Sequence, residues 1–198
     1  VLDYVEGWRQ RYADNNGIMP DNAGPNGTVG ETIDGKWYGG HYGWAFPHGF
    51  YFIADAMVIG GENQRLLTGE EGRLQWVREQ VEMLLTHAIE DETGRLLVPQ
   101  KYTDPDAVIE YAGGANEPMT RPDRVTAYPN FTRQKQIDGW YEFRTLDPAQ
   151  MAHVYADSLD PHDLEVTKRI RDRTNNRWDH VGMGAVHGKD YSGQNHAY

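Results

Sequence analysis

The helical segments predicted in this sequence are joined by connections much longer than those of an ordinary helix bundle. Apolar spacing and helix-start signals predict helices over residues 2–15, 47–59, 68–90, 147–159 and 160–172. Bundles use connections of about 2–8 residues, whereas residues 16–42 and 102–140 are rich in Gly, Pro, Asn and Asp. Helical hairpins separated by long loops are typical of a toroid, in which loops at one end form a cleft. We therefore predict an all-α fold without a sheet.

Composition limits the class of protein and its partners. The chain has 198 residues, of which 38% are apolar and 25% charged, as in a soluble globular domain. No apolar run approaches the roughly 20 residues that cross a bilayer, so we predict no membrane insertion. The net charge of −11 argues against a nucleic-acid partner. The absence of cysteine excludes disulfides and thiolate metal sites.

Local signals mark the ends of the predicted helices. Thr68 to Glu71 matches a capping box, Pro47 suits a first helical position, and Gly60–Gly61 suits a helix end. Asp147–Pro148 and Asp160–Pro161 each combine an N-cap with a proline at the first helical position, which predicts an αα-hairpin. The stretch RLLVPQKY is predicted to be a short extended segment.

The segment from Asp34 to Phe50, DGKWYGGHYGWAFPHGF, combines aromatic side chains with glycines and histidines. Flat rings beside polar groups suit a sugar, because its C–H faces stack on Trp or Tyr while its hydroxyl groups need fixed hydrogen-bond partners. Glycines let such a loop turn tightly and let a ligand approach the backbone. The predicted substrate-binding residues of this segment, of the DGWYEF loop and of the tail are Trp37, Tyr38, Trp44, His48, Trp140, Tyr141 and His187.

Two chemistries for cleaving a glycosidic linkage fit these segments. Hydrolysis needs two carboxylates, about 5–5.5 Å apart for retention or about 6.5–9.5 Å apart for inversion, and Asp34 and Asp138 each precede a Gly in aromatic-rich stretches. Elimination from a uronic-acid glycan needs a base and an acid, which the adjacent His41 and Tyr42 can supply. The net charge slightly favours hydrolysis of a neutral or mildly charged sugar.

Each candidate also has a structural interpretation. Asp-Gly is a common turn dipeptide, which accounts for Asp34 and Asp138 without any function. Large aromatic residues mostly fill cores, so Trp44 can close the core end of the helix that follows. A histidine such as His48 can equally be satisfied within the core or exposed.

Motifs for metals and nucleotides are missing from the sequence. The histidines of the tail have neither HExxH nor zinc-finger spacing, and DNAGPNGTVGE lacks oxygen ligands at the alternate positions of a calcium loop. The GxGxxG, P-loop and GxSxG patterns are absent as well. We therefore predict no metal site and no cofactor.

The segments WYGGHYGWAFPHG and DGWYEF, the helix from Thr68 and the tandem Asp-Pro helices resemble the (α/α)-toroid, or six-hairpin, carbohydrate-active enzymes. That resemblance implies an oligo- or polysaccharide substrate, with paired carboxylates in the hydrolases and Tyr with His in the polysaccharide lyases. A complete toroid needs roughly twice this many helices. Residues 1–198 are therefore expected to be a single domain of a larger ring, with apolar helix faces left exposed.

Two other classes of function remain alternatives. A non-catalytic glycan-binding module would keep its affinity when any single Asp or His is replaced, whereas a helical scaffold for protein partners would bind no glycan and would bury its aromatic residues. The oligomeric state is not predicted. The sequence shows no signal-peptide pattern, although a glycan-degrading activity favours a periplasmic or secreted location.

Overall fold

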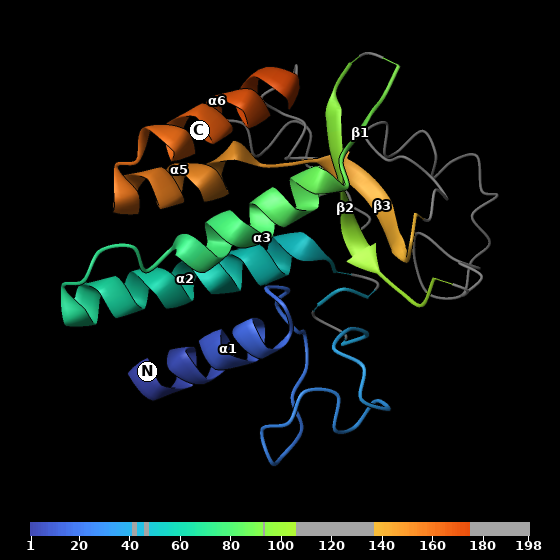
Figure 1. Ribbon diagram of the computed structural model, residues 1–198, viewed down its shortest axis with the longest axis vertical. Coiled ribbons are helices and arrows are strands. Elements are labelled where there is room, and N and C mark those ends of the chain that lie inside the picture. The colour runs from blue at the N-terminus through green and yellow to red at the C-terminus, as the bar shows by residue number, and fades with distance from the viewer. Residues whose placement is uncertain (41–42, 46–47, 93, 106–136, 175–198) are drawn as a thin grey trace, which may run out of the picture.

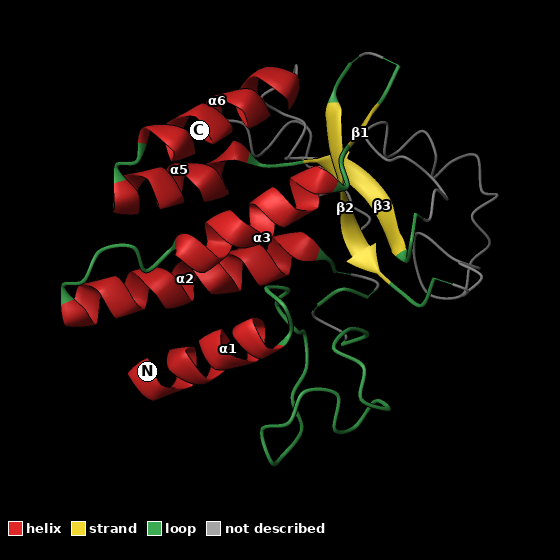
Figure 2. Cartoon of the chain, viewed as in Figure 1, coloured by secondary structure: helices red, strands yellow, loops and turns green. Residues whose placement is uncertain are grey.

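The computed structural model describes residues 1–40, 43–45, 48–92, 94–105 and 137–174. Its helices lie side by side, and a small sheet lies at one end of them (Figures 1 and 2). The elements are α1 (Leu2–Asp14), α2 (Phe50–Thr68), α3 (Gln75–Thr86), β1 (Ile89–Glu90), β2 (Leu96–Tyr102), β3 (Trp140–Thr145), α5 (Pro148–Ser158) and α6 (Pro161–Thr174). The prediction of an all-α fold is wrong, because the described residues form a three-stranded antiparallel sheet, in the order β1-β2-β3, as well as five helices.

The sheet escaped prediction because both of its longer strands are buried on both faces. Nearly every residue of β2 and β3 is buried, so neither strand shows the alternation of a half-exposed strand. Pro99 in the middle of β2 also weakens the strand pattern. The extended segment predicted for RLLVPQKY is confirmed as β2, while DGWYEF is a turn followed by β3 and not a loop.

Helix α2 differs from its predicted boundaries at both ends. It begins at Phe50 after Gly49, so His48 precedes the helix instead of lying in its first turn. It also continues through Gly60 and Gly61. A Cβ atom on Gly61 would lie 2.6 Å from the Arg73 carbonyl oxygen, so this glycine allows close packing and does not end the helix.

The predicted capping box at Thr68 to Glu71 is wrong as well. Thr68 is the last residue of α2, where its hydroxyl donates to the Gln64 carbonyl at 2.8 Å. Gly69 follows with φ 72°, the left-handed conformation that commonly ends helices. Helix α3 starts only at Gln75.

The Asp-Pro signals are confirmed as the starts of α5 and α6. The Asp147 carboxylate accepts from the Ala149 amide at 2.9 Å, and the Asp160 carboxylate accepts from the His162 amide at 2.9 Å. These caps satisfy amides that a helix start leaves without an intrahelical partner. The helix predicted over residues 2–15 is confirmed as α1.

The core lies between the helices and the sheet. Fully buried side chains from α2, α3, β2, β3 and α5 meet there, namely Phe50, Met57, Val77, Val81, Leu84, Leu97, Phe143 and Met151. No helix among the described residues is long and apolar enough to cross a membrane.

Candidate functional site

Asp21 organises the loop that carries the aromatic segment. Its Oδ2 atom accepts hydrogen bonds from the backbone amides of Gly39 at 3.0 Å, Gly40 at 2.9 Å and Trp44 at 2.8 Å. Glycine is needed here for close approach, since a Cβ atom on Gly43 would lie 1.9 Å from Asp21 Cβ. The glycines of this segment therefore let the chain wrap around one carboxylate.

Replacing Asp21 with asparagine is expected to lower the free energy of unfolding by about 1–3 kcal/mol, because the charge that three backbone amides converge on is lost. Urea denaturation would measure this difference. Asp34→Asn is the matched control, because Asp34 has φ 57° and asparagine tolerates that conformation. Equal stabilities for the two variants would contradict the organising role of Asp21.

Aromatic rings from the loop pack against rings from the ends of β2 and β3. The ring centroids of Trp37 and Tyr102 lie 4.7 Å apart, those of Tyr38 and Tyr102 4.8 Å apart, and those of Tyr102 and Trp140 4.7 Å apart. Trp44 lies 5.3 Å from Trp140 in the same cluster. Distances and orientations of this kind stabilise aromatic pairs beyond the area they bury. The cluster fixes the loop to the edge of the sheet.

The members of this cluster differ in their exposure, which separates core residues from candidate ligand contacts. Trp44 is fully buried and its indole N–H donates to the Met19 carbonyl at 2.7 Å. Trp140 is also buried. The rings of Trp37, Tyr38 and Tyr102 are partly exposed. Trp44 and Trp140, which were predicted to bind substrate, therefore lie in the core, and the partly exposed residues Trp37, Tyr38 and Tyr102 are the ones that a ligand can reach.

A pocket of about 380 Å³ opens beside this cluster. Its lining residues come from the loop, the end of β2 and the start of β3: Thr32, Ile33, Asp34, Lys36, Tyr38, Gly39, Ala45, Tyr102, Thr103, Asp104 and Tyr141. Within it, the Asp104 carboxylate accepts from Lys36 Nζ at 2.7 Å and from the Tyr38 hydroxyl. We call this the Asp104 pocket.

Hydrogen bonds and burial shift the pKa values of Asp104 and of the tyrosines in the Asp104 pocket. Hydrogen bonds from Lys36 and then from Tyr38 lower the pKa of Asp104, so this carboxylate is ionised at neutral pH. Burial, followed by the hydrogen bond to Asp104, raises the pKa of Tyr38 to about 12. Burial also raises the pKa of Tyr102 and of Tyr141. The pocket therefore combines an ionised carboxylate with neutral phenols.

Asp34 and Asp138 both lie in turns. Their φ angles are 57° and 50°, and Gly follows each of them with a positive φ. Asp138–Gly139 is the two-residue turn between Ile137 and Trp140, which exchange backbone hydrogen bonds at 2.8 and 2.9 Å. Asp34 nevertheless lines the Asp104 pocket, and the negative charge of Asp138 acts on the Tyr102 phenol.

The remaining predicted residues have different positions. Tyr141 lines the Asp104 pocket. His48 is buried, and its ring lies 4.1 Å from the ring of Phe52. His41, Tyr42 and His187 lie outside the described residues.

Sequence reasoning missed Asp104, Lys36 and Tyr102. Asp104 and Tyr38 are 66 residues apart in the chain. The Tyr102 end of β2 meets the aromatic loop only in the folded chain, where the Tyr102 amide donates to the Trp44 carbonyl at 3.1 Å. The one local signal was the sequence KYTDP, in which a tyrosine and an aspartate flank a threonine.

The described residues contain no group of three or more His, Asp or Glu side chains arranged to hold a metal ion. The sequence model of a family described as a domain of unknown function (DUF8034) matches residues 1–198, so the chain belongs to that family. Neither the curated proteins nor the solved structures compared with the chain gave a match.

Proposed function

We propose that this member of the DUF8034 family binds a neutral oligosaccharide in the Asp104 pocket and hydrolyses a glycosidic linkage there. The observation that carries the proposal is the Asp104 carboxylate, held between the Lys36 ammonium and the Tyr38 hydroxyl beside partly exposed aromatic rings. The lining combines polar groups, among them Asp34, Lys36 and Asp104, with the rings of Tyr38 and Tyr102. Polar partners for hydroxyl groups beside rings for C–H faces are the combination that a sugar needs.

Binding would use the faces of Tyr38 and Tyr102 for stacking on a sugar ring. The two ring planes are inclined by 75°, so they offer two walls at an angle instead of one flat platform. Trp37 packs against both tyrosines, at 4.9 and 4.7 Å, and holds them in place. This support means that little side-chain freedom is lost when a ligand binds.

Two carboxylates that line the same pocket would carry out the two catalytic roles of hydrolysis. Asp104 is ionised at neutral pH, and its hydrogen bonds hold its pKa below the ordinary aspartate value. An ionised carboxylate suits a nucleophile or a base that activates water. Asp34 is the second carboxylate of the pocket and would protonate the leaving oxygen. The bond between the anomeric carbon and that oxygen breaks, water adds its hydroxyl group to the anomeric carbon, and the remaining proton of that water balances the proton that Asp34 gave up.

The tyrosines of the pocket argue against β-elimination by these residues. A tyrosine that removes a proton from a uronate must first lose its own proton, yet the pKa of Tyr38 is raised to about 12. The ionised Asp104 would also repel the carboxylate of a uronic-acid substrate. The lyase alternative would depend on His41 and Tyr42, which lie outside the described residues.

A non-catalytic glycan-binding function is the second candidate, and a specific observation favours it. Both Asp34 and Asp138 precede glycines in tight turns with positive φ, a role that needs no chemistry. In that case the Asp104 pocket would bind a sugar without cleaving it.

The experiment that tests the proposal incubates the protein with neutral and uronic-acid polysaccharides and follows both reducing ends and the absorbance of unsaturated uronates. We expect new reducing ends from a neutral glycan without that absorbance. Tyr102→Ala should weaken binding of the same glycan by about 10-fold or more, because a stacking face is lost. Tyr155→Ala on α5 is the control, because Tyr155 does not line the pocket.

The other outcomes separate the alternatives. Binding without new reducing ends would contradict hydrolysis and support the glycan-binding function. Unsaturated products would show elimination. Equal affinities of Tyr102→Ala and Tyr155→Ala would show that the Asp104 pocket is not the binding site.

A further inference from the structure

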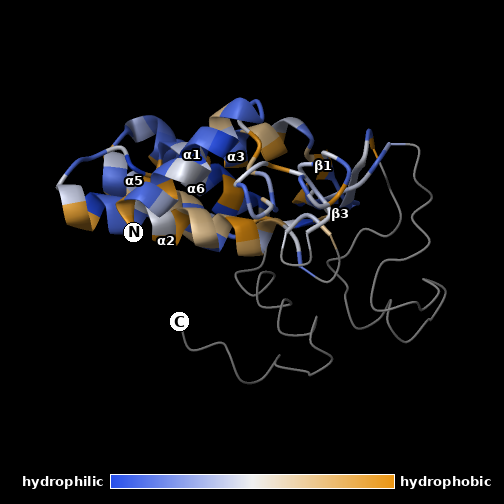
Figure 3. Cartoon of the chain, turned by 90° about the horizontal axis from the view of Figure 1, so that it is seen from below, coloured by the Kyte–Doolittle hydropathy of each residue, from blue (hydrophilic) through white to orange (hydrophobic). Residues whose placement is uncertain are grey.

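Helix α2 has a second apolar face that the core does not use. Its core side is formed by Ile53, Met57, Gly61 and Gln64, which are buried. Elsewhere on the helix lies a set of residues that we call the α2 stripe: Phe52, Ala56, Ile59, Asn63, Leu66 and Leu67. Exposed fractions on the stripe are 37% for Phe52, 59% for Ile59, 82% for Leu66 and 60% for Leu67. Hydrophobic segments of α2 lie along one edge of the molecule in Figure 3.

The spacing of the α2 stripe is that of a coiled-coil seam. Phe52, Ala56, Ile59, Asn63 and Leu66 follow one another at alternating intervals of four and three residues, which is the a/d pattern of a heptad repeat. In that pattern Asn63 occupies an a position. A single polar residue at such a position sets the register and the number of helices that associate, at some cost in stability.

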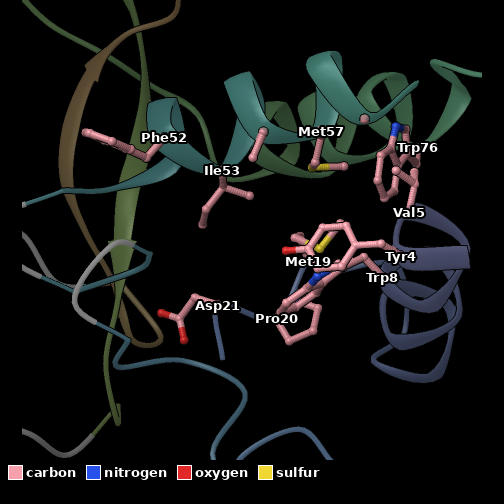
Figure 4. A pocket seen from close by; sticks show the side chains of 12 residues that line it. Tyr4, Val5, Trp8, Met19, Pro20, Asp21, Phe52, Ile53, Met57 and Trp76 are labelled. Carbon is pink, nitrogen blue, oxygen red and sulfur yellow. The ribbon is translucent and has the colours of Figure 1, made fainter. Parts of the chain in front are cut away.

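The apolar surface of the stripe extends to α1 across a pocket of about 200 Å³ (Figure 4). Tyr4 and Trp8 of α1 line one side of this pocket, and Phe52 and Ala56 of the stripe line the other side. Tyr4 is 71% exposed. The pocket therefore provides a hollow into which a large side chain of a neighbouring helix would fit.

The area of this surface suits a stable interface. A large side chain presents roughly 200 Å² when fully exposed, so Tyr4 and the four large stripe residues, at 37% to 82% exposure, present roughly 600 Å². Monomers rarely expose contiguous apolar patches larger than a few hundred Å². A standard interface buries about 800 Å² on each partner, of which about 56–65% is apolar.

We propose that the α2 stripe is a dimer interface, occupied by the α2 stripe of a second copy of this chain. A helix that packs against a heptad seam must have heptad spacing of its own, and α2 of a second copy has that spacing. The stripe residues themselves carry no charge, so the a and d positions of the seam place no like charges face to face. The proposal is independent of the function of the Asp104 pocket.

Replacing Ile59 with aspartate at the centre of the stripe tests the proposal. Sedimentation equilibrium of the wild-type chain from low to high micromolar concentration should show a dimer, and Ile59→Asp should raise the dissociation constant by about 100-fold or more, because the change buries a charge at a contact. Leu159→Asp is the matched control, because Leu159 is 71% exposed and lies outside the stripe. Circular dichroism would establish that both variants keep the wild-type fold.

A second variant keeps the test decisive if Ile59→Asp fails to fold. Asn63→Leu replaces the polar a position with an apolar residue and should lower the dissociation constant by about 10-fold or more. A wild-type chain that stays monomeric at high micromolar concentration would overturn the proposal. So would an unchanged dissociation constant in the two stripe variants.

Discussion

Replacing Glu142 with glutamine should lower the free energy of unfolding by about 3–5 kcal/mol, because the change leaves a buried cation without its counter-charge. Glu142 forms ion pairs with Lys101 of β2 and with Arg144, the latter at 2.9 Å. The side chain of Lys101 is 2% exposed and that of Glu142 is 3% exposed. Urea denaturation at neutral pH would measure the loss.

The pH dependence of this variant gives an independent check. Burial lowers the pKa of Lys101, and the Glu142 carboxylate partly offsets that effect, so the Glu142→Gln change should lower the Lys101 pKa further. A lysine whose folded pKa is below its unfolded value binds more protons when unfolded. The variant should therefore regain part of its lost stability as the pH rises toward the unfolded lysine value of about 10.4.

Glu165→Gln is the control for the loss of a carboxylate. Glu165 pairs with Lys168 at 2.8 Å on the surface of α6, with 69% of its side chain exposed. Exposed pairs of this kind contribute about 0–1 kcal/mol. A loss for Glu142→Gln no larger than that of Glu165→Gln would contradict the role of the buried pair.

The backbone at Glu142 distinguishes this position from an ordinary strand residue. Its φ is 59° within β3, and the strand register has matched partners on either side, Lys101 with Tyr141 and Pro99 with Phe143. A non-glycine residue in this conformation costs of order 1–3 kcal/mol and persists only where the surroundings enforce it. The ion pairs of Glu142 with Lys101 and Arg144 are the surroundings that hold this residue in place.

Which parts of the fold could be predicted depended on whether the signal was local. Asp147 and Asp160 each cap a helix within two residues, so the starts of α5 and α6 followed from the sequence. Strands β2 and β3 are buried on both faces, and Pro99 lies within one of them. Their continuous burial removed the alternation on which strand prediction depends.

The candidate site was also predicted only in part, because only some of its residues left a local signal in the sequence. The aromatic loop indicated a cleft, and Asp34, Tyr38 and Tyr141 do line the Asp104 pocket. Trp44 has the same residue type as a sugar platform, but its ring fills the core, and only the packed structure separates these two roles. Asp104 could not be assigned from the sequence, because it meets Tyr38, which lies 66 positions earlier in the chain.

If the chain hydrolyses glycans as proposed, replacing Asp104 with asparagine should reduce kcat by about 10²–10⁴-fold, the range that one positioned acid or base contributes. The fold should survive, because the side chain is 48% exposed at the edge of the pocket. Asp172→Asn on α6 is the control, because Asp172 does not line the pocket and 61% of its side chain is exposed. Full activity in Asp104→Asn would exclude Asp104 as nucleophile or base.

The acidic limb of the pH–rate profile separates catalysis by Asp104 from a merely structural role. The hydrogen bond from Lys36 is the main reason that the pKa of Asp104 is lowered. Lys36→Met should therefore raise that pKa, so that activity is lost at a higher pH on acidification than in the wild-type chain. A residue that only shapes the pocket would change the rate without moving this limb. An unshifted limb in Lys36→Met would thus show that the ionisation of Asp104 does not control the reaction, even if its replacement lowers the rate.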